Sequence, residues 1–164
     1  MKEIFSRVTV RKYQEKPVET EKLERLLRAA MAAPSAGNQQ PWQFVVVRDR
    51  ALLDQLAQAS PYAKPLLGAP AGIVVLSRTQ GLRFPDYWQQ DLGASTQNLL
   101  LEAEHLGLGA VWMGIAPLED RMQAVKKTLG LGEDVQAFAL VAVGYPQEKP
   151  APHDRYDPSR VQWR

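Results

Sequence analysis

Short apolar runs alternate with segments of helical period along this chain, and that alternation limits the folds open to it. Continuous apolar runs of about four to eight residues are typical of strands in a sheet, whereas apolar residues at i, i+3, i+4 and i+7 indicate amphipathic helices. Strands are predicted at 42–47, 72–77, 109–115 and 136–143. A chain that interleaves such strands with helices folds as an α/β or α+β sheet protein, and we expect the first strand, like the second, to be buried.

The helical segments carry their own start and stop signals. Helices are predicted at 19–32, after Asp49 as N-cap, at 87–107 as the longest one, and between Pro117 and Gly130. Residues 7–12 are too basic for a buried strand and are expected to form a loop, and the chain after residue 145 is a polar tail. The tail still contains Tyr156 and Trp163, so we expect it to pack against something.

Composition excludes several classes of protein. The chain has 164 residues and 45% hydrophobic residues, which fits a single domain over 1–164. It has no cysteine and two histidines, so disulfide scaffolds, thiolate nucleophiles and iron–sulfur clusters are excluded and no metal site is expected. A net charge of +2 is not that of a dedicated nucleic-acid binder. No apolar run is long enough to span a bilayer and residues 1–11 lack the apolar core of a secretory signal, so the expected location is the cytoplasm, with no membrane partner.

Motifs for protein-based catalysis are lacking. The Gly-Leu-Gly stretches at 107–109 and 130–132 begin like a dinucleotide-binding turn, but Trp112 and Val135 occupy the position of the third glycine. Ser35 is not in a nucleophile elbow. We therefore expect no catalytic side chain, and a reaction whose chemistry resides in a bound cofactor.

Three polar stretches are candidates for a binding site. Arg7, Thr9 and Arg11 alternate and would point the same way from an extended segment, which suits a phosphate group; solvated surface arginines are the alternative. Residues 34–38 place small side chains and an amide after a helix, which could meet a polar ring edge or simply form a helix-ending turn. Residues 112–114 end a strand, where ligands often bind, although core packing is the commoner role of Trp and Met.

Three stretches of the chain, taken in order, carry a resemblance to a known family. They are Ser6-Arg7-Val8-Thr9-Val10-Arg11-Lys12-Tyr13, Ala33-Pro34-Ser35-Ala36-Gly37-Asn38-Gln39-Gln40-Pro41-Trp42 and Gly107-Leu108-Gly109-Ala110-Val111-Trp112-Met113-Gly114. Together they resemble the nitroreductase family of FMN-dependent oxidoreductases. The resemblance spans nearly the whole chain. It implies an α+β fold with a mixed four- to five-stranded sheet flanked by helices. It also implies a domain-exchanged homodimer in which residues 145–164 embrace the partner subunit, with 160–163 as an exchanged edge strand.

The same resemblance implies the site. FMN would be bound at the subunit interface, its phosphate and ribityl side held by the basic segment and the tail, its ring met by a partner loop and by the end of the third strand. The implied cofactor-binding residues are Arg7, Val8, Thr9, Arg11 and Arg155, then Pro34, Ser35, Ala36 and Asn38 from the partner, and Trp112, Met113 and Gly114 beside the ring. Lys64 is a further candidate for a flavin contact.

The function implied by the resemblance is transfer of two electrons from NADH or NADPH through FMN to a nitroaromatic, a quinone or a similar small acceptor, by a ping-pong mechanism. Two alternatives stay open on sequence grounds. One is a flavoprotein of the same fold with other chemistry, such as dehalogenation, dehydrogenation or flavin breakdown, because a fold does not fix a reaction. The other is a non-enzymatic module that binds anions or nucleic acid through its arginines and lysines.

Overall fold

Antiparallel pairing joins all four strands into one sheet. The computed structural model describes residues 2–164, and its sheet has the order β1-β2-β4-β3. The strands are β1 (Trp42–Val47), β2 (Ala71–Arg78), β3 (Gly109–Gly114) and β4 (Val135–Gly144). All three ladders are antiparallel. Within residues 2–164 the one parallel pairing is an isolated bridge between Thr9 and Ala110, so the mixed character expected of the sheet reduces to that bridge.

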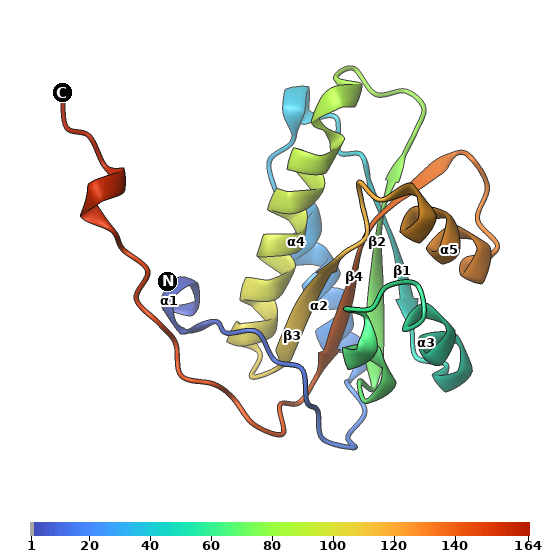
Figure 1. The fold of residues 1–164 in the computed structure, drawn as a ribbon, viewed down its shortest axis with the longest axis horizontal. Helices are drawn as coiled ribbons and strands as arrows, with labels where there is room; N and C mark the ends of the chain where they lie inside the picture. Colours follow the sequence, from blue (N-terminus) through green and yellow to red (C-terminus); the bar gives the residue numbers. More distant parts are fainter. Residues whose placement is uncertain (1) are drawn as a thin grey trace.

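Helices cover both faces of this sheet (Figure 1). They are α1 (Glu3–Ser6), α2 (Thr20–Met31), α3 (Arg50–Leu56), α4 (Trp88–His105) and α5 (Glu119–Leu129), with short turns of 3₁₀ helix at η1 (Ala36–Asn38), η2 (Lys64–Leu67), η3 (Pro85–Tyr87) and η4 (Pro158–Arg160). The predicted helices are confirmed to within one or two residues. Asp49 caps α3 as predicted, its carboxylate accepting a hydrogen bond from the Leu52 amide at 2.8 Å.

The two-residue period of the central strands builds two cores from one sheet. On β4, Leu140 and Ala142 pack with α3 and α5, whereas Val141 and Val143 pack with α2 and α4. Strand β2 alternates in the same way. Because both faces are covered, β2 and β4 are buried along nearly their whole length.

Strand β1 differs from the prediction of a buried strand. It lies at the edge of the sheet and pairs with β2 alone. Of its six residues only Val47 is buried, and Val46 is 37% exposed. An apolar run shows that a segment prefers to be covered, but the number of neighbouring strands is decided by the topology.

The tail after β4 leaves the body of the protein and carries η4 near its end (Figure 1). Its side chains are almost all exposed, including Tyr156 at 69% and Trp163 at 89%. Residues 160–163 form no strand in the chain as described, residues 2–164. None of the helices in that range combines the length and the apolar character that a bilayer crossing requires.

Tyr13 fastens the N-terminal segment to the sheet. Its side chain is 7% exposed, and its hydroxyl lies 2.7 Å from the Val10 carbonyl and 3.1 Å from the Ala142 carbonyl on β4. Burial raises the pKa of this phenol, so the hydroxyl keeps its proton and acts as the donor.

We expect Tyr13→Phe to lower the free energy of unfolding by about 1–3 kcal/mol, because it removes the single O–H donor that two buried carbonyls share. The measurement is urea denaturation followed by circular dichroism. Tyr62→Phe is the matched control, since the Tyr62 side chain is 71% exposed. Equal stability of the two variants would contradict the anchoring role.

Candidate functional site

The basic segment 7–11 runs along the open edge of β3. Thr9 forms a parallel bridge with Ala110, and the Val10 amide donates to the Ala110 carbonyl at 3.1 Å. Val10 is 2% exposed and lies against Gly109, where an added Cβ would come within 2.6 Å of the valine side chain. The segment can approach the strand this closely because position 109 has no side chain.

Side chains of this segment alternate as the sequence predicts. Val8 and Val10 pack toward the core on the α3 and α5 side of the sheet. Arg7 and Thr9 are half-buried and Arg11 is exposed. The three polar side chains are therefore accessible to a ligand. The Val8 side chain packs against the core, so only its backbone groups can contact a ligand.

Arg7 and Arg155 line one groove between α1 and the tail. The groove has a volume of about 480 Å³, and its other lining residues are Ile4, Phe5, Pro152, His153, Asp154 and Tyr156. The Asp154 carboxylate accepts from the Tyr156 amide at 2.9 Å. Two guanidinium groups in one groove are a donor set that fits a phosphate dianion.

The last turn of α4 positions both walls of this groove. The Ser6 hydroxyl donates to Glu104 at 2.8 Å, and the Lys149 ammonium at the start of the tail contacts the same carboxylate oxygen at 2.6 Å. Glu3 lies 3.1 Å from the His105 ring nitrogen, and this contact lowers the pKa of the Glu3 carboxyl. Arg7, one residue after α1, is thus held from α4.

Residues 112–114 meet their surroundings in three different ways. The Trp112 indole is 37% exposed and packs beside Phe138 with 5.5 Å between the ring centroids. The Met113 side chain is buried in the core at 4% exposure, so only its backbone can reach a ligand. Gly114 is exposed, and a Cβ there would meet nothing within 4 Å. Along an edge strand, the backbone groups of alternate residues face the neighbouring strand and the open edge in turn. The Ala110 carbonyl faces the open edge, where it accepts from the Val10 amide, so the backbone groups of residues 112 and 114 face that edge too.

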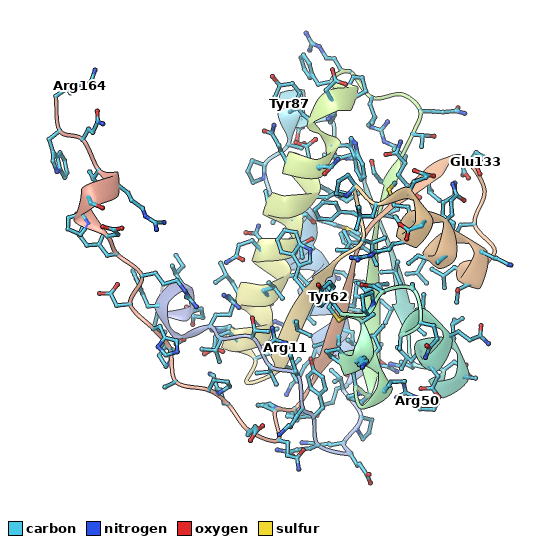
Figure 2. The ribbon with its side chains drawn as sticks, in the orientation of Figure 1. Arg11, Arg50, Tyr62, Tyr87, Glu133 and Arg164 are labelled. Atoms are coloured by element: carbon cyan, nitrogen blue, oxygen red, sulfur yellow. The ribbon has the colours of Figure 1, made fainter. Side chains whose placement is uncertain are left out.

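Residues 34–38 lie near the opposite end of α4. The Ala36 amide donates to Asp91 in the first turn of that helix, at 2.8 Å. Asp91 and Glu104 are separated by about 20 Å at 1.5 Å of rise per residue. Figure 2 shows Tyr87, which directly precedes α4, well away from Arg11. Within one chain, therefore, Pro34, Ser35, Ala36 and Asn38 are not brought together with the arginines. Lys64, the other candidate, begins η2 and is exposed.

Sequence reasoning missed two buried polar residues beside this loop. Asp91 is 4% exposed and Gln39 is 8% exposed. One signal was available: Asp91 lies four residues before Ser95 and eight before Leu99, which places a carboxylate on the buried stripe of α4. An acidic residue on such a stripe indicates a specific partner, because a buried charge is costly without one.

The model of the Nitroreductase family matches residues 4–63 and 60–145. The chain belongs to the Nitroreductase family. An Archaeoglobus fulgidus relative named "Putative NADH dehydrogenase/NAD(P)H nitroreductase" is 41% identical over 98% of this chain and 95% of that protein. A Haliscomenobacter hydrossis relative named iodotyrosine deiodinase is 28% identical over 87% of this chain and 77% of its own length. Among solved structures, one from Desulfovibrio desulfuricans in complex with FMN is 28% identical with a TM-score of 0.88, covering 99% of this chain and 95% of that one.

The close approach at Gly109 gives a prediction about this nitroreductase-family chain. Gly109→Ala should lower the free energy of unfolding by about 1–3 kcal/mol, because the new methyl group collides with Val10. Hydrogen exchange at the Val10 amide should accelerate as the segment leaves β3. Gly114→Ala is the control on the same strand, since its Cβ meets open space. Unchanged exchange at Val10 in Gly109→Ala would refute the packing argument.

Proposed function

We propose that this chain is an FMN-dependent oxidoreductase that passes two electrons from NADH or NADPH to a nitroaromatic, a quinone or a similar small acceptor by a ping-pong mechanism. The observation that carries the proposal is the groove that Arg7 and Arg155 both line, next to the segment that bridges to the open edge of β3. Membership of the Nitroreductase family and a structural relative in complex with FMN support it.

The basic segment and the tail would hold the FMN phosphate. Arg7 and Arg155 supply charged donors from two sides of one groove, and the Thr9 hydroxyl and Arg11 follow along the edge of β3. Charge-assisted hydrogen bonds of this kind contribute about 1.5–3 kcal/mol each, so a few of them retain a cofactor without a covalent link.

The end of β3 would hold the flavin ring. The exposed backbone of Gly114 leaves room for a flat ring, and the outward backbone groups of residues 112 and 114 can hydrogen-bond its polar edge. FMN held there would supply the redox chemistry, hydride and electron transfer between a nicotinamide and the acceptor. The chain positions both molecules against the same ring face, and we assign no catalytic side chain.

Two copies of the chain would complete each site. Support comes from the separation of residues 34–38 from the arginines along α4, and from apolar surface around α1 and the tail. Phe5 is 80% exposed, Ile4 is 52% exposed and Trp163 is 89% exposed. Exposed apolar side chains on α1 and in the tail are surface that a second copy would cover. In this homodimer the tail lies on the partner subunit and residues 34–38 approach the partner's FMN.

Titration with FMN, followed by addition of a nicotinamide and then of benzoquinone, tests the cofactor role. We expect the flavin absorption band to be lost with NADH or NADPH and to return with the quinone. Arg7→Ala and Arg155→Ala should each weaken FMN binding by about tenfold or more, because each removes a charge-assisted contact. Both should keep the unfolding midpoint of the parent, since these side chains contribute little to the core.

Arg164→Ala is the matched control for Arg155→Ala, because it removes another exposed guanidinium from the same tail. FMN affinity equal to that of the parent in both Arg7→Ala and Arg155→Ala would refute the phosphate assignment. A parent that takes up no FMN would instead favour the anion-binding module.

Sedimentation velocity at micromolar concentration tests the dimer. We expect a species of twice the 18.3 kDa chain mass. Phe5→Asp should weaken both association and FMN binding, because it places a charge on the exposed apolar surface. Leu67→Asp is the control, with a side chain 48% exposed on the η2 turn. A stable monomer loaded with FMN would contradict the shared site.

A further inference from the structure

Asp91 is a buried acid whose two oxygens both bind the loop at residues 34–40. One carboxylate oxygen accepts from the Ala36 amide at 2.8 Å, and the other accepts from the Gln39 side-chain amide at 2.7 Å. The residue is 4% exposed. A buried carboxylate is tolerated only with such partners, and here both partners belong to the loop.

Gln39 extends this network to the segment before α4. Its side-chain nitrogen also donates to the Phe84 carbonyl at 3.0 Å, while its side-chain oxygen accepts from the Phe84 amide at 2.9 Å. The backbone carbonyl of Gln39 accepts from the Arg78 guanidinium on β2 at 2.6 Å. Gln39 therefore contacts α4, strand β2 and the segment before α4 at once. The Phe84 backbone fixes the orientation of its side-chain amide.

The backbone of the loop needs this support. Asn38 and Gln40 have φ angles of 55° and 48°, in the left-handed region that is costly for residues with a side chain. Gly37 has a φ angle of 53° and lies under the Phe84 ring, which would come within 2.5 Å of a Cβ at that position. A loop in this conformation persists when its surroundings hold it, and the contacts of Asp91 and Gln39 do so.

We propose that Asp91 and Gln39 are positioning residues of the flavin site. They hold the loop in the one conformation that presents the exposed Asn38 side chain to the FMN of the partner subunit's site. The inference rests on the proposed function and adds to it that the ring-side half of each site is controlled from inside the other chain, by a carboxylate that does not touch the cofactor.

Asp91→Asn is the sharpest variant because it keeps size and shape. The new side-chain amide places an NH₂ donor against the NH₂ donor of Gln39. A flip of the Gln39 amide that exchanges its oxygen and nitrogen would relieve this clash but would place its NH₂ group against the Phe84 backbone N–H. In the FMN-free protein, exchange at the Ala36 amide should accelerate at least about tenfold. The FMN dissociation constant should rise about tenfold. Gln39→Ala should produce the same pair of changes. Asp86→Asn is the matched control, with an exposed carboxylate on η3.

Mixed dimers separate positioning from general loss of stability. Asp91→Asn and Arg7→Ala chains carrying different tags are co-expressed, and the mixed dimer is isolated. If the 34–40 loop acts in the partner's site, one of the two sites combines an intact Arg7 with an intact loop, so half of the sites should bind FMN with parental affinity. The Asp91→Asn and Arg7→Ala homodimers should have no such site.

Absence of any high-affinity site in the mixed dimer would overturn the inference, because it would mean that each chain damages its own site. Parental FMN affinity in the Asp91→Asn homodimer would overturn it as well. A parent that takes up no FMN would refute the proposed function itself, and the exchange measurement at Ala36 would still report whether Asp91 holds the loop.

Discussion

The packing of α4 against the sheet is the contact on which the remaining features depend. Its apolar face enters the core beside β3 and β4, with Leu92 and Leu99 fully buried. Its last turn holds α1 and the start of the tail through Glu104. Its first turn holds the 34–40 loop through Asp91. One rigid helix therefore fixes both polar regions of the candidate site and the separation between them.

That separation explains how a small chain could build a site for a large cofactor. Glu104 and Asp91, which anchor the groove and the 34–40 loop, are about 20 Å apart along α4. A second copy placed in antiparallel fashion would bring the loop of one chain to the groove of the other. Phe5 and the side chains of the tail are exposed in the single chain. The binding residues then need no insertion or additional domain.

The residues of the candidate site bind and orient, and the reactivity is left to the cofactor. The arginines of the groove and the outward backbone of β3 are suited to binding. The buried carboxylate of Asp91 is engaged by the loop through both of its oxygens. Such a protein contributes position and charge, and the bound cofactor contributes reactivity.

Local patterns were sufficient to predict most secondary structure. The period of α2, the stop at Gly130 and the cap at Asp49 depend on neighbouring residues alone, so their prediction was accurate. The alternation of Arg7, Thr9 and Arg11 was predictable for the same reason. The exposure of β1 was not, because it depends on the number of strands beside it.

The sequence by itself determined the elements, the polar stretches and, through its motifs, the family. Only the tertiary structure decided which stretches meet. The packed structure places Arg7 and Arg155 in one groove and residues 34–38 away from both. It also buries Asp91 under a loop more than fifty residues away in sequence. The physical reason is that periodicity and capping arise within a few residues, whereas a groove or a buried ion contact depends on how helices and strands pack, which is set by all of them together.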